Sequence, residues 1–249
     1  MIELVDVCKS FDKSEALKHI NLSIKEGETL AIIGGSGSGK STLLRLLIGL
    51  IRPTSGQILV RGRDVAGLSE AEWDEIRLRM GMVFQYSALF DSMTVGDNVA
   101  FGLREHTDKS EAEIGRIVKE KLALVGLEGV EQMMPNELSG GMKKRVGLAR
   151  AIACEPSVIF YDEPSSGLDP IMTARIDELI VNTQRKLGVT SVVVTHDMAS
   201  ACRIADRIAM IYQGELIAAD TVEKFKQIND DRVQAFFRTL SVAEKEGVA

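Results

Sequence analysis

The sequence contains no long apolar run. Nowhere in its 249 residues is there a stretch near the ~20 consecutive apolar residues that a helix needs to cross a bilayer. The first residues, MIELVDVCKSF, include early acidic side chains and lack the apolar segment of a secretory signal. We therefore expect a cytosolic chain whose connection to a membrane, if any, depends on a partner.

Cysteine is also scarce, and acidic residues outnumber basic ones. Cys8, Cys154 and Cys202 are odd in number and widely spaced, which fits neither a disulfide framework nor a zinc site. Lys and Arg number 30 against 36 Asp and Glu, giving a net charge of −6, and the only dense basic run is 143–145. Because nucleic-acid binding needs clustered cations, we expect no nucleic-acid partner.

Apolar strands alternate with helical patterns and frame a strand-poor middle. Strands are predicted at residues 2–7, 17–24, 28–33, 57–60, 80–84, 158–161, 191–195, 208–212 and 215–218, the last two forming a hairpin. Helices are predicted at 43–51, ended by Arg52-Pro53, and around the apolar faces of 114–125 and 176–187. The pattern predicts one α/β domain over 1–240, a helical subdomain inserted at approximately 86–156, and a flexible tail at 241–249.

A glycine-rich segment follows the third predicted strand and carries a complete GxxxxGK[ST] motif. Its residues are Gly34, Gly35, Ser36, Gly37, Ser38, Gly39, Lys40, Ser41 and the following Thr42. Glycines let backbone N–H groups approach a phosphate, and the next helix adds its N-terminal dipole. Lys40 is expected to reach the β- and γ-phosphates of ATP, and the Ser41 hydroxyl to bind Mg²⁺. The strand before and the helix after argue against an incidental glycine turn.

Two adjacent carboxylates follow the apolar run at 158–161. Asp162 is suited to Mg²⁺, and Glu163 can polarise a water molecule as a general base. Such a pair alone is more often a solvated strand end, but the phosphate loop upstream favours the catalytic interpretation. Between the phosphate loop and this pair, Ser139, Gly140 and Gly141 open a helix and form a second candidate anion site.

The segment Leu138-Ser139-Gly140-Gly141-Met142 resembles the LSGGQ signature of the ATP-binding cassette (ABC) ATPases. The resemblance implies a P-loop NTPase fold with a RecA-like core, an N-terminal antiparallel β subdomain and an inserted α-helical subdomain. It also implies a homodimer in which the phosphate loop of one copy faces the Ser139 helix of the other across ATP.

Four further residues match the family's functional positions, in order along most of the chain. Phe11 matches the aromatic residue that stacks on adenine, where Tyr is commoner. Gln85 matches the glutamine that senses Mg²⁺ and the attacking water. Asp169 ends the Ser-Gly-Leu-Asp stretch that matches the D-loop, and His196 matches the histidine that contacts the γ-phosphate.

Other segments resemble the ATPases of Mla/Mce-type phospholipid transporters. They are LSGGM, with Met142 in place of the usual glutamine, and residues 87–90, 97–107, 134–137, 169–171 and 231–236. This resemblance implies a membrane permease, an Mce-type substrate-binding protein and a STAS-domain subunit as partners. It implies phospholipid movement between inner and outer membranes, with the chain on the cytoplasmic face of the inner membrane. Leu89 and Phe90, in an apolar loop after Gln85, are expected to contact the permease.

Two alternatives stay open at this point, and a third is excluded by the motifs. An importer ATPase for amino acids or another small solute would share every motif. An iron–sulfur assembly ATPase is a single soluble domain of similar size. A P-loop kinase or GTPase would lack the LSGG helix and the D-loop, both of which this sequence contains.

Overall fold

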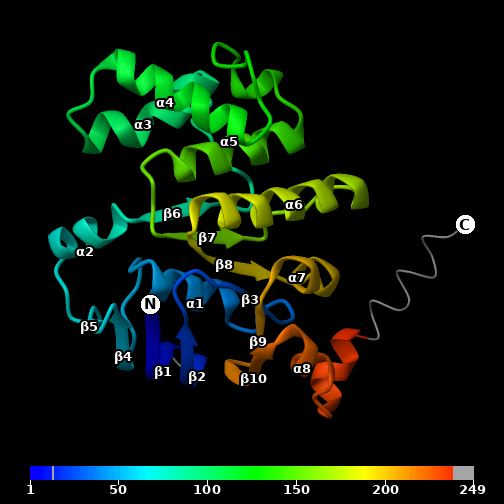
Figure 1. The fold of residues 1–249 in the computed structure, drawn as a ribbon. Coiled ribbons are helices and arrows are strands. Elements are labelled where there is room, and N and C mark those ends of the chain that lie inside the picture. The colour runs from blue at the N-terminus through cyan, green and yellow to red at the C-terminus, as the bar shows by residue number, and fades with distance from the viewer. Residues whose placement is uncertain (13, 238–249) are drawn as a thin grey trace, which may run out of the picture. The chain divides into compact units, whose positions relative to one another are not determined.

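The computed structural model describes residues 1–12 and 14–237, so the expected tail at 241–249 lies outside the described residues. The chain divides into two compact units, one made of Met1–Leu68 and the chain from Val192, the other of Ser69–Ser191. Both contain strands and helices, as expected for an α/β protein (Figure 1). None of the helices in the described part combines the length and apolar character that crossing a bilayer requires.

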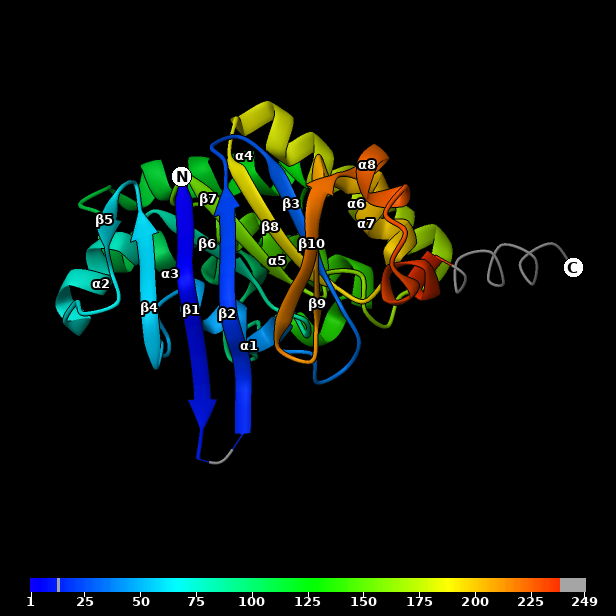
Figure 2. The same ribbon diagram turned by 90° about the horizontal axis from the view of Figure 1, so that it is seen from below.

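An antiparallel sheet of order β2-β1-β4-β5 forms one part of the first unit. Its strands are β1 (Ile2–Phe11), β2 (Ser14–Ile24), β4 (Ser55–Val60) and β5 (Arg63–Asp64). Ile2 pairs with Ile24 on one side and with Val60 on the other. Figure 2 shows β1, β2 and β4 side by side. Alternate residues of β2, such as Leu22 and Ile24, are buried, which accounts for the period-two pattern in the sequence.

Buried parallel strands of the first unit hold the phosphate loop. β3 (Thr29–Ile33) is fully buried and runs parallel to β9 (Arg207–Tyr212), with Leu30 opposite Arg207. β9 pairs antiparallel with β10 (Glu215–Thr221). Gln213 and Gly214 both have positive φ, 50° and 83°, as a two-residue hairpin turn requires, and this confirms the predicted hairpin. The unit also holds α1 (Lys40–Leu47), α7 (Met198–Ile204), α8 (Val222–Lys226) and the end of β8 (Thr190–Thr195).

The helix expected at residues 43–51 has different limits. It is α1, which begins at Lys40 and ends at Leu47. Gly49 takes a left-handed φ of 70°, and its N–H bonds to the Leu46 carbonyl, so the helix ends before Arg52-Pro53. The prediction of a proline-terminated helix was therefore wrong at both ends.

Two parallel strands and a group of helices make up the second unit. β6 (Met80–Val83) pairs with β7 (Val158–Asp162), Met80 lying opposite Val158. The helices are α2 (Glu70–Arg77), α3 (Val95–His106), α4 (Glu111–Leu124), η1 (Pro135–Glu137), α5 (Gly140–Ile152) and α6 (Pro170–Leu187). No strand lies between β6 and β7, as predicted, and all of this segment is described. The limits given for a helical subdomain, approximately 86–156, stay a prediction.

Helices α3, α4 and α5 pack against one another in this unit (Figure 1). Ile114, Val118 and Leu122 form the buried face of α4, at the spacing seen in the sequence. Arg104 of α3 reaches both carboxylate oxygens of Glu111, at 2.9 and 2.8 Å, where α4 begins. Its hydrogen bonds lower the pKa of Glu111, so the carboxylate stays charged beside the helix N-terminus.

Candidate functional site

The phosphate loop, residues 34–42, connects β3 to α1. Gly34 is packed so closely that an added Cβ would lie 2.2 Å from the Ile211 carbonyl oxygen and 2.6 Å from Ser38 Oγ. Gly39 caps α1 with a left-handed φ of 112°, which directs the chain into the helix. Ser36, Gly37 and Ser41 are exposed. The loop therefore presents a helix N-terminus and glycine amides on an accessible surface, as phosphate binding requires.

Lys40 lies folded over this loop. Its side chain is buried, and its Nζ donates to the Gly34 carbonyl at 2.7 Å and the Gly35 carbonyl at 3.0 Å. Ser38 Oγ is buried and has no hydrogen-bond partner within the described part of the chain. A cation and an unpaired hydroxyl in one glycine loop suit a phosphate group, which accepts from both. The residues present therefore fit the triphosphate expected from the sequence.

Phe11 and His196 belong to the same unit as the phosphate loop. Phe11 ends β1 and is 45% exposed, and Lys9 Nζ lies 4.9 Å from its ring centroid. An exposed ring next to a cation suits stacking on an aromatic base. His196 is exposed directly after β8, where Asp197 caps α7 by accepting from the Ser200 amide at 3.1 Å. The position at the carboxyl end of a strand is the one expected.

The carboxylate pair lies in the second unit. β7 is buried from Val158 to Tyr161, and Asp162 and Glu163 become partly exposed where it ends. Directly after β7, Glu163 has a φ of +47°, a left-handed backbone conformation that is uncommon for a residue with a Cβ. Carboxylate and hydroxyl oxygens are the ligands that Mg²⁺ prefers, so Asp162 and Ser41 are chemically suited to it.

Gln85 and Glu163 are brought together in this unit. The Gln85 amide Nε2 donates to Ser166 Oγ at 3.2 Å, and the Ser166 N–H donates to the Glu163 carbonyl at 3.1 Å. Lys144 Nζ also bonds to the Gln85 carbonyl and lies 3.5 Å from the Glu163 carbonyl. The pKa of Lys144 is lowered because burial strips its ammonium of water, an effect opposed by the negative charge of Glu163.

Ser139 is the N-cap of α5, which we call the signature helix. Its Oγ accepts from the Met142 amide at 3.3 Å, and both Ser139 and Gly140 are exposed. Gly141 is buried against α6, where an added Cβ would lie 2.4 Å from the Met172 methyl carbon. Asp169 caps α6 by accepting from the Ile171 and Met172 amides, both at 2.9 Å. The predicted second anion site is thus an exposed helix N-terminus.

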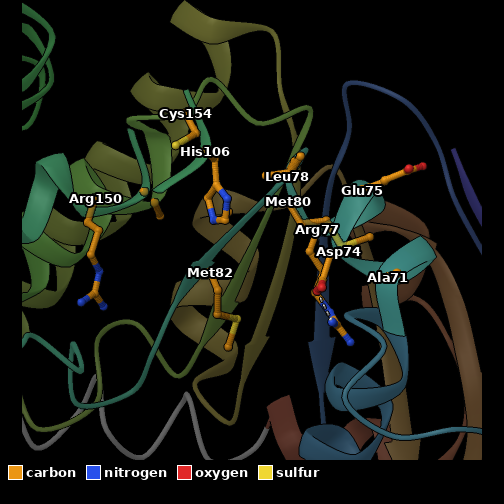
Figure 3. Close-up of a pocket in the computed structure, with 13 residues that line it drawn as sticks. Ala71, Asp74, Glu75, Arg77, Leu78, Met80, Met82, His106, Arg150 and Cys154 are labelled. Carbon is orange, nitrogen blue, oxygen red and sulfur yellow. Dashed lines mark hydrogen bonds and ion pairs between the residues drawn. The ribbon is translucent and has the colours of Figure 1, made fainter. Parts of the chain in front are cut away.

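A groove of about 590 Å³ opens beside α2, β6, α3 and α5. In Figure 3, His106 and Met82 lie between Arg150 on one side and Asp74 and Arg77 on the other. Arg150 donates to the Ser87 and Ala88 carbonyls at 2.8 and 2.7 Å, so it also holds the segment after β6. Sequence reasoning missed this groove and the contacts of Lys144 and Arg150. It considered the run 143–145 only as a possible nucleic-acid patch.

The family follows from comparison with known proteins. The profile of the family described as ABC transporter matches residues 17–166, which is more than half of the chain. The chain belongs to the ABC transporter family. The resemblance based on Ser139–Gly141, and the fold it implied, are therefore confirmed.

Individual ABC proteins align over most of this chain. "Probable ribonucleotide transport ATP-binding protein mkl" of Mycobacterium tuberculosis is 46% identical over 87% of the chain, which spans 60% of that relative's length. "Intermembrane phospholipid transport system ATP-binding protein MlaF" of Haemophilus influenzae is 46% identical over 88% of the chain and 83% of the relative. "Methionine import ATP-binding protein MetN" of Rhizobium johnstonii is 46% identical over 87% of the chain and 60% of the relative.

A solved ABC structure agrees in fold. It is a dimeric post-hydrolysis state of the ATP-binding cassette MJ0796 bound to ADP and Pi. It superimposes with a TM-score of 0.82 at 35% identity, covering 89% of this chain and 99% of that one.

Proposed function

We propose that this chain binds and hydrolyses ATP as a subunit of an ABC transporter that moves phospholipid between inner and outer membranes. The observation that carries the proposal is the phosphate loop, with Lys40 over the Gly34 and Gly35 carbonyls and the unpaired Ser38 hydroxyl. The dimeric relative bound to ADP and Pi supports nucleotide chemistry for this fold.

The reaction assigns one task to each predicted residue. The phosphate loop and Lys40 bind the phosphates, Phe11 stacks on adenine, and His196 contacts the γ-phosphate. Glu163 accepts a proton from the attacking water, which Gln85 orients. Ser41, Asp162 and Gln85 would hold Mg²⁺, which would supply neutralisation of the phosphate charge.

A homodimer completes the site. Each chain has one phosphate loop and one signature helix, and both begin helices with exposed N-termini. In a dimer, the Ser139–Gly141 amides of one copy bind the triphosphate held by the other, with Asp169 at the interface. ATP then binds the closed dimer better than the open one, and this difference in affinity drives the conformational change.

The apolar segment after Gln85, with Leu89 and Phe90, is the surface that suits contact with the permease. Tyr86 is 85% exposed and Phe90 is 41% exposed, whereas Leu89 is partly buried. Phe90 lies 4.8 Å from Phe101, centroid to centroid, so an aromatic surface adjoins the segment that Arg150 holds. Exposed aromatic residues are typical of protein interfaces. The chain would thereby be peripheral, on the cytoplasmic face of the inner membrane. Mce-type and STAS-domain subunits complete the proposed complex.

The test uses Glu163→Gln with the wild-type chain beside it. The variant should bind ATP as tightly as wild type, lose at least 100-fold in hydrolysis rate, and accumulate as a dimer with ATP in size-exclusion chromatography. Wild-type turnover by Glu163→Gln, measured together with its membrane partner, would remove Glu163 from the role of general base.

A rival cargo is supported by the likeness to a methionine importer ATPase. Lipid analysis of the detergent-purified complex separates them. Bound phospholipid, with ATPase activity that rises on phospholipid addition, favours the proposed cargo. A complex free of lipid whose activity responds to methionine favours the importer.

A further inference from the structure

The signature helix carries two basic side chains whose charged ends meet backbone carbonyls instead of carboxylates. Lys144 Nζ bonds to the Gln85 carbonyl and lies 3.5 Å from the Glu163 carbonyl. Six residues further along, Arg150 donates to the Ser87 and Ala88 carbonyls. One helix therefore holds the chain after β6 at several points between Gln85 and Ala88.

Lys144 is buried to an extent that is rare for an ammonium group. Only 7% of its surface is exposed. It borders a small, mostly apolar cavity with Leu148, Tyr161 and Ile180. A buried charge is costly unless it is hydrogen-bonded or paired, so the carbonyls of Gln85 and Glu163 and the negative charge of Glu163 together make this position tolerable.

The contacts close into a ring, which we call the hydrogen-bond ring. Lys144 joins the carbonyls of Gln85 and Glu163. The Ser166 N–H donates to the Glu163 carbonyl at 3.1 Å, and Ser166 Oγ accepts from Gln85 Nε2 at 3.2 Å. The ring therefore fixes the backbone of Gln85, and of Glu163 with its φ of +47°, relative to the signature helix.

We infer that Lys144 is a positioning residue for ATP hydrolysis, whose ammonium sets the geometry of Gln85 and Glu163 from the signature helix. The inference rests on the proposed function. Lys144 acts by holding the carbonyls of the two residues proposed to orient and deprotonate water. A side chain without the ammonium leaves two buried carbonyls under-satisfied and frees both residues to shift, which slows catalysis more than it weakens nucleotide binding.

Three variants of the full chain test the inference. Lys144→Met keeps the length of the side chain and removes the charge, whereas Lys144→Arg keeps hydrogen-bonding capacity. Lys143→Met is the matched control on the same helix, since the Lys143 side chain makes no hydrogen bond or ion pair with any described residue. We expect Lys144→Met to lower kcat roughly ten- to 100-fold with KM within about threefold, Lys144→Arg to recover at least part of kcat, and Lys143→Met to match wild type.

A second measurement does not depend on hydrolysis. Hydrogen–deuterium exchange of residues 84–88 and 163–168 should quicken at least tenfold in Lys144→Met and stay unchanged in Lys143→Met. Unchanged exchange in Lys144→Met overturns the ring. Faster exchange with wild-type kcat, or with a loss confined to KM, overturns the positioning role. A wild-type chain that hydrolyses no ATP with its membrane partner refutes the proposed function, and the exchange result still decides whether Lys144 holds Gln85 and Glu163.

Discussion

Gly34→Ala should damage both the stability of the first unit and its affinity for ATP. The new Cβ would lie 2.2 Å from the Ile211 carbonyl oxygen, whereas close C···O contacts are about 3.3 Å. Roughly 1 Å of backbone movement is needed, because a carbonyl in a buried strand cannot swing aside as a flexible side chain does. Overpacking of this kind costs ~1–3 kcal/mol, and we expect the upper end.

Thermal unfolding and nucleotide titration measure the two effects. At roughly 2–4 °C per kcal/mol for a chain of this size, the midpoint should fall by about 6–12 °C. ATP affinity should fall at least about tenfold, because the loop amides and Lys40 move with the backbone. Gly35→Ala is the matched control, since a Cβ there meets no heavy atom within 4 Å. If Gly34→Ala unfolds and binds ATP like Gly35→Ala, the reasoning about the loop is refuted.

Three further predictions concern the second unit. Ser69→Ala removes the hydroxyl that accepts from the Glu72 amide at the start of α2, and should cost about 1 kcal/mol in a urea titration, whereas Ser69→Asp, another good cap, should not. Burial raises the pKa of the Cys154 thiol above its ordinary 9.0. The neutral thiol therefore contributes fully to stability below pH 9, and this contribution is lost as the pH rises above 9. The urea midpoint of wild type should fall more steeply above pH 9 than that of Cys154→Ala, and equal slopes would contradict this. Trp73, the sole tryptophan, is 4% exposed, so acrylamide should quench its fluorescence several-fold less in the native protein than in urea; equal quenching would show that α2 is not packed as described.

Local sequence signals were sufficient to predict secondary structure where a residue's conformation depends on its neighbours in the chain. Alternation at residues 2–7 predicted the start of β1, and Gln213-Gly214 predicted the hairpin because a tight turn demands positive φ at both positions. Ser139 was correctly placed at the start of a helix, since its hydroxyl caps an amide three residues away. The roles given to the site residues stay predictions.

Sequence signals failed for short elements that bury few side chains and for contacts between residues that are distant in the sequence. Helix α2 buries only Trp73, so its sequence shows no apolar period, although the Ser69 and Glu72 capping box was there to be recognised. The end of α1 depended on the left-handed Gly49, and the sequence interpretation relied on proline instead. Lys144 and Gln85 are 59 residues apart, and nothing in a run of basic residues indicates a carbonyl partner at that distance.

Lys144 and Arg150 donate to backbone carbonyl oxygens, and this has a consequence for which positions of the chain can change in evolution. A main-chain oxygen is present whatever amino acid occupies a position, so replacements at 86 or 89 can alter the surface proposed to contact a permease while the helix keeps its hydrogen bonds to this segment. Lys144 and Arg150 are more restricted, because their side chains supply the hydrogen-bond donors. Relatives with different membrane partners can therefore vary the exposed side chains of this segment and keep the hydrogen bonds that hold its backbone.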